Sequence, residues 1–208
     1  MVKASNADEY IAQMRAAIAS NPECGTSHYN LGVALMGKGQ DAEAENCFMA
    51  ALDSSPSLAE AYSQMGALCL KRGDLDGCLD WNQRAVKARP GFSEGYGNIG
   101  FVHLQRGEAD EAIKALKRST AFNDRFVQGF ATLANAYLMK GMVDESIETN
   151  LKVLDLAPEF AIAHGNLAIG YIEKGDFTKA IEHADKAKAL GYDVPQPILA
   201  ELEPHRSV

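Results

Sequence analysis

The chain has 208 residues, of which 47% are hydrophobic and 23% are charged, and its net charge is −8. This apolar content is enough to bury a sizeable core, and it excludes an intrinsically disordered chain. Phosphate contacts need clustered Lys and Arg, which this acidic chain lacks, so we expect no nucleic-acid binding.

No part of the chain predicts a membrane or export segment. The first residues, MVKASNADEYIAQM, contain no apolar run of the length that a signal peptide needs. No stretch approaches the ~18 continuous apolar residues of a membrane helix. We therefore expect a cytoplasmic protein without membrane insertion.

The first predicted element is a single helix over residues 7–20. Asn6 followed by Glu9 fits a capping box, and Tyr10, Ile11 and Met14 lie at helical spacing. The pattern matches the second half of a helix hairpin whose first half is missing. Such an end leaves one face without its usual neighbour, which favours pairing with another copy of the chain or with a partner protein.

Five equal segments follow without an insertion, over residues 25–58, 59–92, 93–126, 127–160 and 161–194. Each segment holds an apolar residue followed by a small one, thirty-four residues after the previous pair. These pairs are Leu31–Gly32, Met65–Gly66, Ile99–Gly100, Leu133–Ala134 and Leu167–Ala168. A strict period of this length predicts a stacked array of helix hairpins. We call a set of positions one period apart a column.

Other columns predict where each hairpin turns and ends. The turn column is glycine throughout and suits a left-handed helix C-cap: Gly39, Gly73, Gly107, Gly141 and Gly175. Asp74 and Asp176 stand where the second helix needs an N-cap, and Pro56, Pro90 and Pro158 close their units. Residues 195–208 are expected to cap the array, with Ile198, Leu199 and Leu202 facing the last repeat. The prediction is one domain over residues 1–208.

These columns resemble the tetratricopeptide repeat, whose pattern is W-x-x-L-G-x-x-Y followed by a small residue, an aromatic and a proline. The resemblance covers five full repeats and the half repeat before them. It implies an all-α, right-handed solenoid of antiparallel helix hairpins. It also implies a non-catalytic protein–protein interaction module that binds a peptide or helix of a partner protein in a concave groove.

We expect neither an enzyme nor a cofactor or metal site. The chain has no H-E-x-x-H, nucleophile elbow, Walker loop or G-x-G-x-x-G. The cysteines show no C-x-x-C spacing; they are Cys24, Cys47, Cys69 and Cys78. His28, His103 and His164 occupy packing columns, which favours a structural role over catalysis.

In the tetratricopeptide family the first helices of the repeats line the groove, so the positions left after removing the core columns are the predicted site. These residues are Tyr29, Asn30, Val33, Gln64, Leu70, Asn98, Phe101, Leu104, Thr132, Asn135, Leu138, Asn166 and Ile169. Tyr29 and Phe101 are the expected anchors, because aromatic residues dominate interface energetics. Gly97, Ala131 and Gly165 are expected to leave room beside them for a ligand.

One groove column is a series of neutral polar residues, which we call the amide ladder: Asn30, Gln64, Asn98, Thr132 and Asn166. An amide donates and accepts at once, so a ladder of amides can pair with the backbone of an extended peptide. It resembles the asparagine ladder of O-linked N-acetylglucosamine transferases. The alternative is that Asn in this column is a habit of the family without a binding role.

Charge argues against one known kind of partner. Co-chaperones of this family grip acidic chain termini with Lys and Arg, but the positions here are neutral, and Glu94 has the wrong sign for a carboxylate ligand. A chaperone-tail clamp is therefore not expected.

The first repeat carries the acids Asp41, Glu43 and Glu45, with Asp53 at the end of the same segment. They are either a docking patch for a basic partner or a solvated face.

Two questions stay open at this point. Asn82 and Asn150 occupy a column that is usually aromatic, and a buried amide without a partner costs about 1–3 kcal/mol. Each either finds a bond between helices or softens its repeat.

The alternative function is an assembly scaffold or homo-oligomer that acts through its terminal helices and convex face. The identity of the partner cannot be predicted from the sequence.

Overall fold

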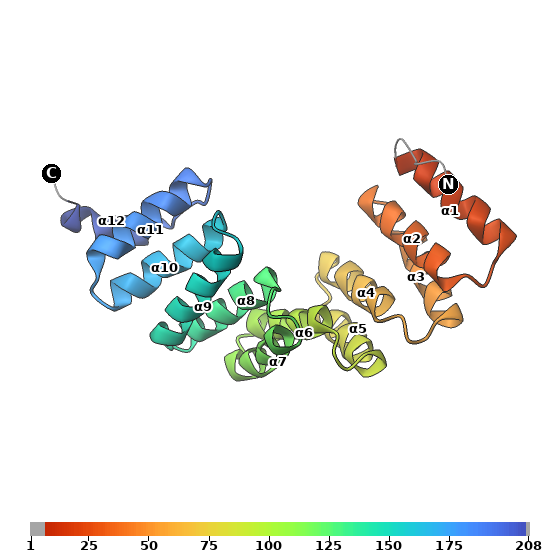
Figure 1. Ribbon diagram of the computed structural model, residues 1–208, viewed down its shortest axis with the longest axis horizontal. Helices are drawn as coiled ribbons and strands as arrows, with labels where there is room; N and C mark the ends of the chain where they lie inside the picture. Colours follow the sequence, from red (N-terminus) through yellow and green to blue (C-terminus); the bar gives the residue numbers. More distant parts are fainter. Residues whose placement is uncertain (1–6, 207–208) are drawn as a thin grey trace. The chain divides into compact units, whose positions relative to one another are not determined.

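The computed structural model describes residues 7–206, and these residues are almost entirely helical, with no strand among them (Figure 1). The helices are α1 (Ala7–Ser20), α2 (Gly25–Gly37), α3 (Asp41–Ser54), α4 (Ala59–Lys71), α5 (Leu75–Ala88), α6 (Ser93–Gln105), α7 (Ala109–Phe122), α8 (Val127–Met139), α9 (Val143–Leu156), α10 (Ala161–Glu173), α11 (Phe177–Ala189), α12 (Gln196–Leu202) and the short 3-10 helix η1 (Glu203–His205). The predicted all-α array of helix hairpins is confirmed. Asn6, the first residue of the predicted capping box, lies outside the described residues.

The chain divides into two compact units, and the boundary falls inside α6 between Ile99 and Gly100. Unit 1 runs from α1 into the first half of α6, and unit 2 runs from the second half of α6 to the C-terminus. None of the described helices is both long enough and apolar enough to cross a lipid bilayer.

The core of unit 1 explains the small residues of its repeats. Leu31 and Leu35 of α2 pack with Phe48 of α3, and all three are buried. A Cβ added to Gly32 would lie 2.6 Å from the Phe48 ring, so only glycine lets α2 and α3 pack with an aromatic residue between them. Ile11 of α1 joins the same core.

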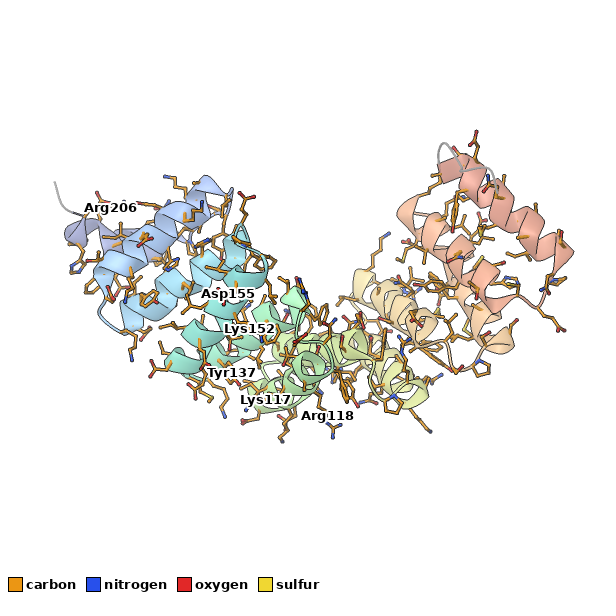
Figure 2. All side chains as sticks on the ribbon, in the orientation of Figure 1. Lys117, Arg118, Tyr137, Lys152, Asp155 and Arg206 are labelled. Atoms are coloured by element: carbon orange, nitrogen blue, oxygen red, sulfur yellow. The ribbon has the colours of Figure 1, made fainter. Side chains whose placement is uncertain are left out.

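Unit 2 repeats this arrangement and ends on the short helix α12. Leu116 of α7 is buried with Leu133 and Tyr137 of α8. Leu202 of α12 is fully buried in the cluster that α10 and α11 form. Arg206, which Figure 2 labels, donates to both carboxylate oxygens of Asp185 on α11 at 2.6 and 2.9 Å. The Arg206 guanidinium holds the pKa of Asp185 below its ordinary value.

The turns inside the hairpins follow the predicted chemistry. The five glycines of the turn column have φ between +70° and +77°, the left-handed region that L side chains avoid. Asp74 accepts a hydrogen bond from the Gly77 N–H at 2.8 Å, and Asp176 accepts one from the Lys179 N–H at 3.2 Å. Both aspartates are therefore N-caps, as predicted.

Ion pairs link successive repeats within each unit. In unit 1, Lys71 at the end of α4 pairs with Asp41 at the start of α3, with the two charged groups 2.6 Å apart. In unit 2, Lys174 after α10 pairs with Asp144 of α9 at 2.7 Å. All four side chains are at least one-third exposed, so each pair contributes about 0–1 kcal/mol.

Ion pairs of the same kind involve the acidic residues of the first repeat. Besides the bond between Asp41 and Lys71, Glu43 pairs with Arg15 at 3.0 Å and Glu45 with Arg72 at 2.6 Å. Neighbouring helices thus neutralise three of the four acids. The docking-patch interpretation does not hold for these three, because their charge is already compensated within the chain.

Candidate peptide-binding surface

The predicted site residues of unit 1 lie on the first helices of its repeats. Core residues Leu31 and Leu35 turn one side of α2 toward α3, so Asn30 and Val33 lie on the other side. Val33 is 38% exposed, and Leu70 of α4 is 37% exposed. Tyr29, Asn30, Gln64 and Asn98 are half-buried. Apolar and amide side chains therefore alternate on this surface.

The Asn98 amide is held by two neighbours in unit 1. Its Nδ2 donates to the Ser63 hydroxyl of α4 at 3.0 Å and to Asn82 Oδ1 of α5 at 2.9 Å. Asn82 is fully buried, and its own Nδ2 donates to the Cys78 carbonyl at 2.8 Å. The open question about Asn82 is thereby answered: it connects two helices through a satisfied hydrogen-bond network.

Tyr29 lies beside the Gln64 ladder amide, one repeat earlier. Burial raises the pKa of Tyr29 above its ordinary value, the charge of Glu60 acts in the same direction, and a hydrogen bond with the Gln64 side chain opposes the shift. Tyr29 also packs on Phe48, with the ring centroids 6.0 Å apart.

The site residues of unit 2 show a different distribution. Asn135 is exposed, and four apolar residues are half-buried: Phe101, Leu104, Leu138 and Ile169. The two ladder members, Thr132 and Asn166, are only 7% and 5% exposed. The Thr132 hydroxyl donates to the Gln128 carbonyl of its own helix at 2.8 Å. The expectation that these two residues offer polar groups to a ligand is corrected, because their side chains are buried in unit 2.

Asn150 and Asn166 occupy the same columns in unit 2 as Asn82 and Asn98 do in unit 1. Asn150 Nδ2 donates to the Ser146 carbonyl at 3.0 Å, as Asn82 does to Cys78. However, Asn150 Oδ1 and Asn166 Nδ2 are buried without a hydrogen-bond partner. The residue that matches Ser63 is Ala131, which has no hydroxyl to accept from Asn166.

The small residue Gly165 does not leave room for a ligand. A Cβ built on it would lie 2.5 Å from the Tyr192 ring, so this aromatic side chain of the chain itself fills the space. Gly97 and Ala131 are buried as well. The predicted space beside the anchor residues is therefore not present at these positions.

The histidines of the packing column bond to turn carbonyls. His28 Nε2 lies 2.8 Å from the Pro22 carbonyl, and His164 Nε2 lies 3.2 Å from the Pro158 carbonyl. A carbonyl oxygen only accepts, so Nε2 carries the proton in both rings. His164 Nδ1 is 2.9 Å from Nδ1 of His183, a residue that the sequence reading missed. Burial lowers the pKa of His183, and the neighbouring His164 adds to the effect.

Other chemically reactive groups do not converge on this surface. All four cysteines are free thiols, and burial raises the pKa of Cys78. Within residues 7–206, no group of three or more potential metal ligands comes together. An open cavity of about 260 Å³ lies between α8 and α9, where the Lys152 ammonium is 4.8 Å from the Phe130 ring centroid. Figure 2 labels Lys152 and Tyr137, two of the residues that line this cavity, and the lining includes none of the predicted site residues.

Comparisons with known proteins agree with the repeat pattern. A family model described as tetratricopeptide repeat matches residues 2–59. No curated protein matches the chain significantly.

Solved structures match most of the chain. The tetratricopeptide protein YrrB, described as having an unusual peptide-binding site, is 22% identical with a TM-score of 0.68, over 92% of this chain and 96% of YrrB. MamA is 23% identical with a TM-score of 0.67, over 81% of this chain and 92% of MamA. PilF of Pseudomonas aeruginosa is 15% identical with a TM-score of 0.79, over 96% of this chain and 97% of PilF. At these identities the likeness establishes the fold. The family match over residues 2–59 and the fold of these structures both agree with the tetratricopeptide resemblance of the repeat columns.

Proposed function

We propose that the chain is a non-catalytic protein–protein interaction module that holds a peptide or helix of a partner protein on its first-helix surface. The observation that carries this proposal is the surface of unit 1, where Val33 and Leu70 expose apolar area beside the Asn30 and Gln64 amides. Apolar anchors next to groups that hydrogen-bond are what peptide recognition requires.

The comparison with YrrB supports this class of function. YrrB is described as having a peptide-binding site, and its fold matches this chain over 92% of its residues. At 22% identity the likeness does not identify binding residues. The choice of residues rests on the exposure and contacts of the side chains in this chain.

We treat the two units separately. In unit 1 the proposed contact residues are Tyr29, Asn30, Val33, Gln64, Leu70 and Asn98. In unit 2 they are Phe101, Leu104, Asn135, Leu138 and Ile169. Thr132 and Asn166 are omitted because they are buried.

The alternative is an assembly scaffold or homo-oligomer that acts through the ends of the array. Fewer observations support it. At the N-terminal end, Tyr10 of α1 is 36% exposed and could contact a partner. At the C-terminal end, Leu202 of α12 is buried against α10 and α11 of the same chain. The experiment below separates the two functions.

The test is affinity capture from the native cell with the full chain as bait. The double variant Val33→Glu and Leu70→Glu places charges on exposed apolar positions of the proposed surface. Met49→Glu is the matched control, because Met49 is 41% exposed on α3 of the same unit but lies outside the proposed surface. Circular dichroism verifies that each variant folds.

We expect the control to capture the same partners as the native chain and the double variant to lose them. If the double variant retains every partner, the first-helix surface of unit 1 is not the binding site. If the captured protein is a second copy of the chain, and Tyr10→Glu abolishes its capture, the scaffold function replaces the proposal.

A further inference from the structure

The hydrogen bonds of Asn98 give its amide a fixed direction. A side-chain NH₂ has two hydrogens, and Asn98 Nδ2 has two acceptors within reach, Ser63 Oγ at 3.0 Å and Asn82 Oδ1 at 2.9 Å. Both donor sites of this amide are therefore used inside unit 1. Within residues 7–206, these hydrogen bonds leave Oδ1 as the polar atom of the Asn98 side chain that can accept from a ligand.

The direction of this amide is fixed by a buried neighbour. Turning the Asn98 amide over would place its Oδ1 against Asn82 Oδ1, which replaces an attraction by a repulsion between two acceptors. Asn82 cannot turn to compensate, because it is fully buried and its Nδ2 donates to the Cys78 carbonyl at 2.8 Å. Ser63 and Asn82 are therefore positioning residues for the amide of Asn98.

An amide whose NH₂ group is occupied still has two lone pairs on its carbonyl oxygen. Asn98 thus presents an acceptor to a ligand in preference to a donor. Gln64 lies half-buried on the same surface, one repeat earlier.

The charges around these amides favour the same kind of ligand. Lys71, a cation of this face, pairs with Asp41 at 2.6 Å. Glu94 is exposed, and its Oε2 accepts a hydrogen bond from the neutral Ser93 hydroxyl at 3.3 Å. The surface therefore offers a ligand the Asn98 carbonyl oxygen and the Glu94 carboxylate, whereas the charge of Lys71 is compensated by Asp41.

We propose that unit 1 carries an acceptor surface, centred on Asn98 Oδ1, that binds an extended partner segment through its backbone N–H groups. The segment that it fits has neutral or basic side chains. This inference rests on the proposed function and specifies which hydrogen-bonding groups the partner contributes. It also separates this surface from one that grips a peptide by its carbonyl groups or its carboxylate.

The first experiment needs no ligand. Nuclear magnetic resonance on the full chain measures how fast the side-chain NH₂ protons of Asn98 exchange with water. We expect slow exchange for Asn98 and fast exchange for the control Asn46, which is exposed on α3. We expect Ser63→Ala to accelerate the exchange of Asn98 and Ser63→Thr, which keeps a hydroxyl, to preserve slow exchange. Exchange of Asn98 as fast as that of Asn46 in the native chain would overturn the inference.

The second experiment uses short linear peptides selected by display against the full chain. The tightest peptide is synthesised with each backbone amide replaced in turn by an ester, which removes one N–H donor with little change of shape. We expect at least one ester to weaken binding by roughly threefold to tenfold, the value of one hydrogen bond. We also expect the selected peptides to contain more Lys and Arg than Asp and Glu.

The results distinguish the inference from the proposed function. If Val33→Glu abolishes peptide binding but no ester weakens it, or if the selected peptides are acidic, the acceptor surface is wrong and the interaction module stands. If neither Val33→Glu nor Leu70→Glu weakens any selected peptide, unit 1 does not supply the binding surface of the proposed function, and this inference fails with it.

Discussion

Units 1 and 2 contain the same pair of asparagines at the same register, yet the two pairs differ in their hydrogen bonds. In unit 1, Asn98 donates to both Asn82 and Ser63. In unit 2, the matching Asn166 Nδ2 and Asn150 Oδ1 have no partner. The two pairs also differ in one neighbouring residue, which is Ser63 on α4 in unit 1 and Ala131 on α8 in unit 2. Only the serine has a hydroxyl that can accept a hydrogen bond. A column of identical residues therefore does not guarantee identical chemistry.

The largest expected effect comes from removing the buried asparagine of each pair. Asn82→Leu keeps the shape of the side chain but leaves Asn98 without one acceptor, so we expect a loss of about 1–3 kcal/mol in the free energy of unfolding. Asn150→Leu removes an acceptor that is already unpartnered, so we expect a neutral or stabilising effect. Urea denaturation followed by circular dichroism measures both. Equal losses in the two variants would show that the pairs do not differ.

A smaller effect is expected from exchanging the residue that differs between the pairs. Ala131→Ser supplies an acceptor near Asn166 and should stabilise the chain by about 0.5–1.5 kcal/mol, while Ser63→Ala should destabilise it by a similar amount. Repeating each substitution in an Asn166→Leu or Asn98→Leu background isolates the pairwise energy. A coupling energy of zero in unit 2 would contradict the hydrogen bond expected there.

The histidine contact of unit 2 predicts a pH dependence that should not occur in unit 1. The pKa of His183 is lowered from 6.5, mainly by burial, with His164 and Lys179 acting in the same direction and Glu182 against it. A histidine with a lowered pKa in the folded state stabilises the fold fully above 6.5, and this contribution is lost as the pH falls below that value.

We therefore expect amide hydrogen exchange in α10 and α11 to become faster than exchange in α2 and α3 when the pH falls from about 7 to about 5, after correction for the intrinsic rate. His183→Gln should flatten this difference. An unchanged difference in that variant would assign the pH effect to other groups.

The smallest effect concerns a feature that both units share. Lys71→Met and Lys174→Met each remove one exposed ion pair between repeats, and we expect a loss of at most about 1 kcal/mol from each. Because salt screens exposed charges, the loss should shrink in molar salt. Thermal unfolding at low and high salt measures this. Losses that persist at high salt would point to packing by the lysine stems instead of charge.

The elements that could be predicted from the sequence are those that depend on one repeat at a time. Gly73 must adopt a positive φ at its turn and Asp74 caps the next helix, and both requirements act over a few adjacent residues. Gly32 is small because Phe48, in the same hairpin, lies against it. These local requirements recur with the period, so the period reveals them.

The site was harder to predict because it depends on residues from two repeats. The direction of the Asn98 amide follows from Ser63 and Asn82 in the preceding repeat. The space beside Gly165 is filled by Tyr192, which stands in a column that proline occupies elsewhere. No spacing rule within a single repeat shows either contact. Residues of one column can thus make different contacts in different repeats, because their neighbours differ.

The ion pairs between repeats have a consequence for the length of the array. Lys140 meets Asp110, and Lys174 meets Asp144, at the same register one repeat apart. If a recombination event removed residues 127–160, Lys174 would come to the position of Lys140 and would face Asp110. Every whole-repeat deletion or duplication at this place therefore rejoins an acid with a base. The ion pairs between repeats therefore place no restriction of their own on gaining or losing a whole repeat at this place.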